Sequence, residues 1–548
     1  MDKSLAVRIV TLSRMRAYRV ISLWPGTLAV AFLGTVIGGS LAGIMARFGT
    51  GDLMAIVTDA YLHSVIGFTL WQATLSTLIS VGLALPIARA YARQSHFVGR
   101  RTLITLMGLP MVMPVIVAVL GIVAVYGHNG VITQLMRTAG LTWPFGIYGL
   151  GGILLAHVFF NLPLAVRLLL PAWEQVPGES WRLASTLGMS STQLFRFIEW
   201  PALSAFLPGA LVIVFLLCFT SFAVVLTLGG GPGATTVEVA IYQALRFDFD
   251  PGRATLLALT QLVLCATIAL TMSRWLRSQP LTQGLQEGLR NRPDRKAPLN
   301  RTVDVLLITV SALFIGLPIA AVVVAGLEGP LLRVILDSAL WSATARSLGI
   351  ALIATLIAGV LALGLAMTAR RLVLVQRRPG ATDLVLLAGS VSLAVPPMVI
   401  GTGLFLWALM TGTTEVVTLL LIALINALMI LPYALRSIAP VLIDSGRRHH
   451  KLCEQLGLQG WQRFRRIDWP AIRKPTAFAV ALGSALSFGD MGVAALFDTS
   501  GAITLPVMLY HRMSAYRFDE AAVTALVLVV MSLILFWALD RIVGRWLS

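Results

Sequence analysis

Two stretches of this chain share the same pattern of residues. Residues 182–201 read RLASTLGMSSTQLFRFIEWP, and residues 451–470 read KLCEQLGLQGWQRFRRIDWP. In both, a Leu-Gly pair is followed by nine residues and then by Ile, an acid, Trp and Pro. Leucines at i and i+4 share one face of a short helix, and the glycine can end that helix and let the chain turn. The proline suits the first turn of a further helix. We therefore expect a helix–turn–helix in each of the loops 174–201 and 443–470.

Long apolar runs surround both loops. Hydrophobic residues make up 57% of the 548 residues and charged residues only 12%, about half of the roughly 25% that soluble domains carry. This composition excludes a soluble enzyme, a disordered or fibrous protein and a disulfide scaffold, and the unbroken runs argue against a β-barrel. A spanning helix needs about 20 apolar residues. Twelve runs meet that length, near 22–46, 64–88, 103–126, 147–170, 201–228, 253–276, 303–326, 341–368, 383–410, 415–440, 471–497 and 519–540. The fold class expected is an all-α polytopic membrane protein.

The chain matches itself at an offset of about 269 residues well beyond the two loops. Leu162-Pro163 and Arg167 recur as Leu431-Pro432 and Arg436, for example. Each half then holds six spans in the same order and orientation, which is a parallel repeat. We expect a first half at 1–276, a polar linker at 277–301 and a second half at 302–548.

Basic residues indicate which side of the membrane each loop faces. The net charge of +18 could suggest nucleic acid, but the Lys and Arg residues lie in short loops between apolar runs, as they do on the cytoplasmic side of membrane proteins. With twelve spans, both termini and both repeated loops fall on the basic side. We therefore expect both termini to be cytoplasmic. All but eight of the 42 Lys and Arg residues lie on that side, the eight being Arg47, Arg137, Arg246, Arg253, Arg333, Arg346, Arg512 and Arg517.

The doubled loop resembles the EAA loop of the permeases of binding-protein-dependent ABC importers. That loop has the form Glu-Ala-Ala, three residues, Gly, nine residues, Ile, any residue, Leu-Pro. The spacing from glycine to isoleucine and the proline match in both halves, whereas Arg182-Leu183-Ala184 and Lys451-Leu452-Cys453 replace Glu-Ala-Ala. Segments such as His157–Pro163 and Ser487–Asp490 also look like the fused permease of bacterial thiamine importers, and the fused permeases of iron(III) importers share some of them.

The resemblance implies a type I importer permease in the bacterial inner membrane. It would work with two copies of a cytoplasmic ATPase subunit and with a periplasmic substrate-binding protein. The expected substrate is thiamine or its phosphate esters, with iron(III) as the alternative. The proposed mechanism is alternating access, in which the ATPase moves both loops as rigid levers. The residues expected to contact the ATPase are Leu183, Ala184, Leu187, Gly188, Ile198, Pro201, Leu452, Leu456, Gly457, Ile467 and Pro470.

One acid within the apolar runs stands out as a substrate-path candidate. Asp490 lies in the eleventh run, and charges inside a membrane are costly and usually functional. It either faces the path of a cationic substrate or caps a break in the helix near Gly489 and Gly492. Asn161 and Asn426 are expected to form hydrogen bonds between helices. Kinks are expected in spans three and nine, at Pro110, Pro114, Pro396 and Pro397.

No catalytic, cofactor or metal site is predicted. The glycine-rich run 229–236 has no lysine and so does not form a phosphate-binding loop, which means that a separate chain must hydrolyse ATP. His449 and His450 lie in a basic loop rather than in a ligand cluster, and the three cysteines are scattered. A twelve-span secondary carrier is the less favoured class, because its usual motif between spans two and three is incomplete here and it does not explain the doubled loop.

Overall fold

The computed structural model describes residues 23–46, 58–141, 146–276, 292–393, 395–412, 414–458, 460–498 and 503–546. Over these ranges the regular structure is helical throughout, and eleven helices are long and apolar enough to cross a membrane. The all-α polytopic fold expected from the apolar runs is confirmed. The basic N-terminal tail and most of the expected linker 277–301 lie outside the described residues.

The helices pack into two compact units, and neither unit is a continuous stretch of sequence. Unit 1 contains Met1–Phe48, Trp341–Leu505 and Val530–Ser548. Its buried core gathers leucine, isoleucine and alanine side chains from several of its helices. The main helices of unit 1 are α2 (Trp24–Met45), α18 (Ser338–Leu374), α19 (Pro379–Ala388), α20 (Pro397–Thr411), α21 (Glu415–Gln455), α22 (Gly460–Arg463), α23 (Trp469–Phe488) and α24 (Gly492–Leu496).

Unit 2 contains Gly49–Leu340 and Pro506–Val529. Helices α4 and α9 pack along one another, and α12 packs on both. The last long helix, α26 (Phe518–Arg541), begins in unit 2 and ends in unit 1. The other main helices of unit 2 are α4 (Ala60–Arg93), α5 (Arg100–Leu106), α6 (Leu109–Val112), α7 (Val115–Tyr126), α8 (Val131–Thr138), α9 (Leu150–Glu174), α10 (Gly178–Thr186), α11 (Ser191–Leu194), α12 (Trp200–Phe219), α13 (Ala223–Leu228), α14 (Val237–Arg246), α15 (Pro251–Leu276), α16 (Pro298–Glu328), α17 (Leu331–Ile335) and α25 (Leu505–Ser514).

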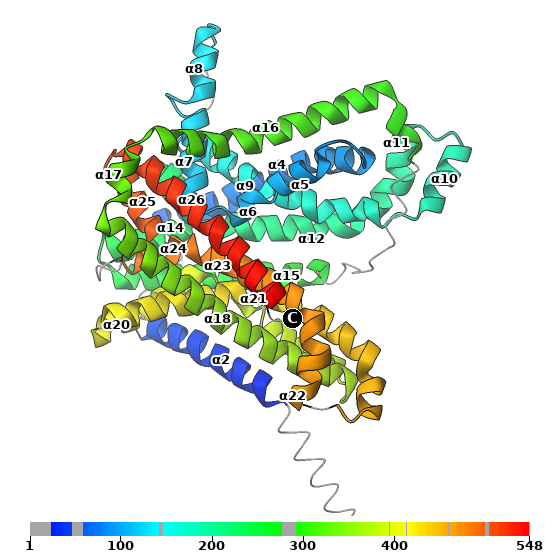
Figure 1. Cartoon of the computed structure of the whole chain (residues 1–548). Helices are drawn as coiled ribbons and strands as arrows, with labels where there is room; N and C mark the ends of the chain where they lie inside the picture. Colours follow the sequence, from blue (N-terminus) through cyan, green and yellow to red (C-terminus); the bar gives the residue numbers. More distant parts are fainter. Residues whose placement is uncertain are drawn as a thin grey trace, which may run out of the picture. The chain divides into compact units, whose positions relative to one another are not determined.

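The first of the described helices, α2, belongs to the unit that is built mainly from the later part of the sequence. Helix α2 packs against α20 in unit 1 (Figure 1). The two backbones approach so closely that a Cβ on Gly43 would lie 2.6 Å from the Gly403 carbonyl oxygen. Ser40 Oγ donates to the Ile400 carbonyl oxygen at 2.9 Å. Small residues and buried hydrogen bonds of this kind hold helices together in lipid, where apolar burial between helices contributes little.

Unit 2 shows the reciprocal arrangement. Helix α16, which follows the linker region, packs against α7 and α4 (Figure 1). Phe314 of α16 lies 6.3 Å from the Tyr126 ring and 6.2 Å from the Phe159 ring, centroid to centroid. Aromatic contacts of this geometry add to the packing. Each unit therefore includes at least one long helix that is separated by the linker from most of that unit's sequence.

The prolines in the third and ninth apolar runs interrupt the helices, and the kinks expected there are wrong. In the third run, α6 ends at Val112, the backbone is extended at Met113 and Pro114, and α7 begins at Val115. In the ninth run, α19 and α20 are separate, and Pro396 has an extended ψ of 145°. A proline removes the N–H that an uninterrupted helix needs and restricts the residue before it, so closely placed prolines and glycines end the helix.

Candidate functional site

The first loop, 174–201, forms the expected helix, turn and helix. Helix α10 ends at Thr186, and Gly188 takes a left-handed backbone conformation with φ +61°. The N–H of Met189 donates to the Ala184 carbonyl oxygen at 3.1 Å, and that of Gly188 to the Ser185 carbonyl oxygen at 3.1 Å. This pattern satisfies the last carbonyls of the helix and favours glycine at the left-handed position.

The second loop, 443–470, repeats that turn. Helix α21 is continuous from its apolar run to Gln455, so here the first helix of the loop extends a long helix. Gly457 has φ +64°, and the N–H of Leu458 donates to the Cys453 carbonyl oxygen at 2.9 Å. The two glycines quoted from the sequence therefore perform the same structural task.

After the turn, both loops pass through one wide helical turn before the next long helix. The turns are Phe195–Glu199 and Phe464–Asp468. In each turn, the backbone N–H of the Trp that follows donates to the carbonyl oxygen five residues earlier, that of Phe195 or Phe464. Such turns admit an extra residue into a helix. Each lies directly before the Trp-Pro pair that opens α12 or α23, where the proline has no N–H to give.

Each loop exposes two leucines and buries the residue that directly follows the first of them. Leu183 and Leu187 are 62% and 61% exposed, whereas Ala184 is 1% exposed. In the second loop, Leu452 and Leu456 are 46% and 63% exposed. Large apolar side chains exposed on a polar loop are typical of a contact with another protein.

A small apolar cluster supports the first loop from beneath. Trp181, Ala184, Leu194 and Val176 are buried there, and Ile198 packs against them. In the second loop, Cys453 is 1% exposed and Ile467 is half-buried. Of the remaining residues expected to contact the ATPase, Pro201 and Pro470 are exposed.

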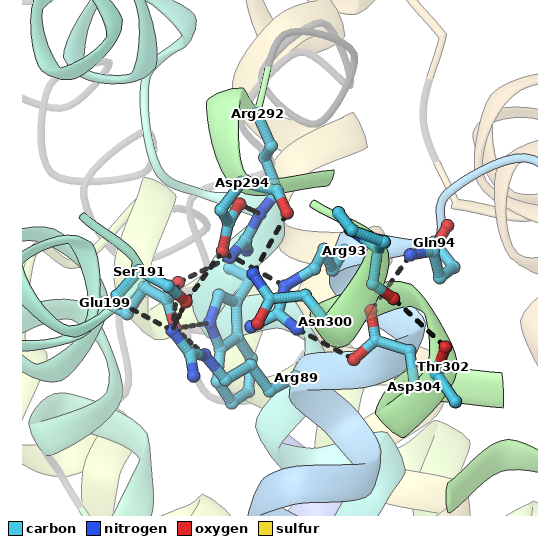
Figure 2. A network of polar contacts seen from close by, with 12 residues as sticks. Arg89, Arg93, Gln94, Ser191, Glu199, Arg292, Asp294, Asn300, Thr302 and Asp304 are labelled. Atoms are coloured by element: carbon cyan, nitrogen blue, oxygen red, sulfur yellow. Dashed lines mark hydrogen bonds and ion pairs between the residues drawn. The ribbon is translucent and has the colours of Figure 1, made fainter. Parts of the chain in front are cut away.

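A buried acid in each loop was not among the residues selected from the sequence. Glu199 and Asp468 are each 1% exposed and occupy the same place before Trp-Pro. The carboxylate of Glu199 pairs with Arg89 of α4 at 2.7 Å, accepts from Trp173 Nε1 at 3.1 Å and pairs with Arg292 at 2.5 Å (Figure 2). The repeat of the acid was visible in the sequence, but its arginine partners were not.

The acid of the second loop is also held by two arginines. Asp468 lies 2.5 Å from a guanidinium nitrogen of Arg370 on α18 and 3.7 Å from that of Arg463. A buried carboxylate needs such partners, because a bare charge out of water is costly. Both acids thus tie the start of a long helix to a neighbouring helix of the same unit.

Asp490 lies where helix α23 gives way to α24. Its Oδ1 accepts from the N–H of Gly492 at 3.2 Å, which caps the break between the two helices. Among the described residues, no hydrogen bond of ordinary geometry reaches its buried Oδ2. Close along α23, Ser487 accepts a hydrogen bond from Asn426 Nδ2 at 2.9 Å. The acid therefore caps the break through its Oδ1.

The expected hydrogen bonds between helices are confirmed at both asparagines. Asn426 of α21 donates to Ser487 of α23, and Asn161 of α9 lies 3.2 Å from the sulfur of Cys218 on α12. Nothing in the described part of the chain gathers three or more metal-ligating side chains.

Residues 361–547 match the family described as "Binding-protein-dependent transport system inner membrane component". The thiamine transport system permease protein ThiP of Brucella suis biovar 1 (strain 1330) is 44% identical over 518 residues, 94% of each chain. ThiP of Escherichia coli (strain K12) is 41% identical over 525 residues, 95% of this chain and 97% of the relative. The chain belongs to this family of importer permeases. A more distant member, a putative ferric transport system permease protein of Haemophilus influenzae, is 27% identical over 252 residues, 44% of this chain.

Members of this family are transport subunits and not enzymes, in agreement with the prediction from the sequence. The permease is the membrane subunit of an ABC importer, and ATP is hydrolysed by a separate subunit. Each of the two loops presents exposed leucines and is joined by a buried acid to a neighbouring helix of its own unit.

Proposed function

We propose that this permease moves thiamine or its phosphate esters across the inner membrane by alternating access. Two copies of a cytoplasmic ATPase subunit bind the loops 174–201 and 443–470, and a periplasmic binding protein delivers the substrate. Both termini are cytoplasmic in this proposal. The support for thiamine is the likeness over nearly the whole chain to permeases that are named for thiamine transport.

The observation that carries the mechanism is the doubled loop. Each copy joins an exposed leucine pair to a buried acid at the base of a long helix. Force applied to the leucines therefore reaches the membrane helices through a rigid, charge-anchored turn. An amphipathic helix seated in an apolar groove of the partner is the binding mode that suits these leucines.

Asp490 is the residue that we assign to the substrate path. Thiamine carries a permanent positive charge on its thiazolium ring, and a carboxylate oxygen without a hydrogen bond of its own is suited to such a cation. The other oxygen of Asp490, Oδ1, accepts from the N–H of Gly492 at the start of α24. The residue can therefore hold its position while it contacts a passing ligand.

The test is uptake into proteoliposomes that contain the permease, its ATPase and its binding protein. Labelled thiamine should accumulate only when ATP is supplied, and iron(III) should not. Accumulation of iron(III) in place of thiamine would favour the alternative substrate. Accumulation without the ATPase would indicate a secondary carrier.

The docking role is tested with glutamate in place of the leucines. Leu183→Glu with Leu187→Glu, and Leu452→Glu with Leu456→Glu, should each lower co-purification of the ATPase by on the order of 100-fold, because a buried charge opposes docking. Leu332→Glu is the matched control, since Leu332 is 79% exposed on α17, outside both loops. Normal co-purification by both loop variants would refute the docking role.

A further inference from the structure

The end of the linker region, near residue 292, contacts the first loop although it lies far from that loop in the sequence. Arg292, with no exposed side-chain surface, inserts beside Glu199 and forms an ion pair with it (Figure 2). The guanidinium carbon of Arg292 lies 4.4 Å from the centre of the Trp181 ring on α10. The short turn Pro293–Lys296 packs against α10. A cation stacked on an aromatic face and paired with a carboxylate is held in a narrow range of positions.

Asp294 extends this contact from the loop to α4. Its carboxylate accepts from Arg292 Nε at 3.2 Å, from Arg93 Nε at 3.0 Å and from Ser191 Oγ at 3.3 Å (Figure 2). Burial raises the pKa of Asp294, but Arg292, Arg93 and Arg89 together lower it below the ordinary value. The carboxylate is therefore ionised at neutral pH and can pair with each arginine.

A further ion pair reaches helix α16. Arg93 Nη1 lies 2.9 Å from Asp304 Oδ1, and Gln94 Nε2 donates to Asp304 Oδ2 at 2.9 Å (Figure 2). Acids and arginines thus alternate from the first loop through the turn and the end of α4 to the start of α16. The network has three arginines and three carboxylates, so its formal charge is balanced. In low dielectric, such a network is stable only when every member keeps its partner.

Among the described residues, the second loop has no counterpart to this connection. Its acid, Asp468, is paired with Arg370 of α18 and with Arg463, five residues earlier in the same loop. No residue from a linker takes part in that described contact. The two loops therefore meet the same charge requirement with arginines from different parts of the chain.

We infer that Arg292 is a positioning residue that makes the first loop and α16 move as one body. This inference rests on the proposed function, since it concerns how motion of the ATPase reaches the membrane helices. In this arrangement the segment between the two halves transmits motion. The first loop directs α16 through a chain of ion pairs that includes Arg292, whereas the second loop is tied through Asp468 to α18 without a residue from the linker region.

The decisive experiment compares Arg292→Met with Arg295→Met in the full chain, assembled with its ATPase in nanodiscs. Methionine keeps the length of the side chain and removes its charge. Arg295 is the matched control, because it lies in the same turn and its one hydrogen bond among the described residues is to the His96 carbonyl oxygen, at 3.3 Å. Hydrogen–deuterium exchange is followed separately in residues 178–199 and 447–468.

We expect Arg292→Met to speed exchange in the first loop by about tenfold, with no change in the second, because local opening follows the loss of local anchors. Arg295→Met should leave both loops unchanged. Equal acceleration in both loops, or none in either, would overturn the inference. This measurement needs no substrate, so it stands apart from any failure of the thiamine proposal.

Coupling provides the readout that separates positioning from simple stability. In proteoliposomes that contain equal amounts of assembled permease, Arg292→Met should lower the number of substrate molecules moved per ATP hydrolysed several-fold. Arg292→Lys should restore it only in part, because lysine keeps the charge but lacks the planar fork that reaches both acids. If Arg292→Met leaves the number of substrate molecules moved per ATP hydrolysed unchanged, Arg292 is structural and the inference is wrong.

A double variant checks that Arg292 acts through Glu199. The effects of Arg292→Met and Glu199→Gln on the coupling ratio should not add, because the two side chains form one contact. Additive effects would show that Arg292 acts by another route and would overturn the inference.

Discussion

The two loops have the same turn but different anchors. Glu199 of the first loop is paired with Arg292, which lies 93 residues away along the chain. Asp468 of the second loop is paired with Arg463 from the same loop. Duplication preserved the glycine turn, the exposed leucines and the buried acid, all of which depend on local sequence. The buried acid needs a second positive charge nearby, but that charge need not come from one position in the sequence. Different parts of the chain can therefore supply the second arginine.

Removal of the buried acids should give the largest loss of stability and the clearest difference between the two loops. Loss of one partner from a buried ion pair costs about 3–5 kcal/mol. Glu199→Leu removes the carboxylate partner of Arg89 and one of the two carboxylates around Arg292, whose side chain has no exposed surface. Asp468→Leu removes the carboxylate partner of Arg370, which is 13% exposed. We expect Glu199→Leu to reduce thermal stability in detergent more than Asp468→Leu, as measured by tryptophan fluorescence. Equal losses would mean that the linker arginine adds nothing to the anchor.

A second difference between the two halves is the acid Asp490, which a substitution can test. At the offset of the repeat, Ser221 stands in the place of Asp490, so only one half has the acid. Asp490→Asn keeps the hydrogen bond to Gly492 but removes the charge. We expect uptake of thiamine to fall by about tenfold or more, with normal co-purification of the ATPase, because a cation loses its countercharge within the membrane. Unchanged uptake would leave Asp490 as a helix cap alone.

The glycine turns should respond alike, which checks that the loops are equivalent where they look equivalent. Gly188→Ala and Gly457→Ala each place a Cβ on a left-handed backbone with no neighbour within 4 Å, at a cost of about 1–2 kcal/mol. Gly359→Ala in α18 is the control, since a Cβ there also meets nothing within 4 Å and its φ is not positive. A loss at one turn only, in thermal unfolding, would contradict the equivalence.

The smallest effect is expected from pH. Because the pKa of Asp294 is lowered in the folded protein, its contribution is complete above the unfolded value of about 3.9. It is lost only as the pH falls through the lower, folded value. Exchange in the first loop, corrected for intrinsic rates, should therefore stay constant from pH 8 to 5. A rise between pH 7 and 5 would show that another group controls the anchor.

Local features were predictable from the sequence because they depend on near neighbours. The apolar runs predicted most of the long helices, although the ninth run forms two shorter ones, and the Leu-Gly spacing predicted both turns. Helix partners were not predictable, since α2 and α16 are as apolar as other spans and hydropathy does not show which helix they contact. Pro114 and Pro396 were identified as sites of distortion, but whether a proline bends or ends a helix depends on its surroundings. Arg292 lay in a segment that composition marked only as a polar linker.

The placement of α2 has a consequence for biogenesis. This helix leaves the ribosome among the first, yet α20, which it packs against in unit 1, is made from residues 397–411. At about 5–20 residues per second, α2 waits for tens of seconds before its partner exists. During that interval its glycine-lined face must lie against lipid or an insertion chaperone. Severing the gene between the halves would leave each product without one of the helices that its unit requires.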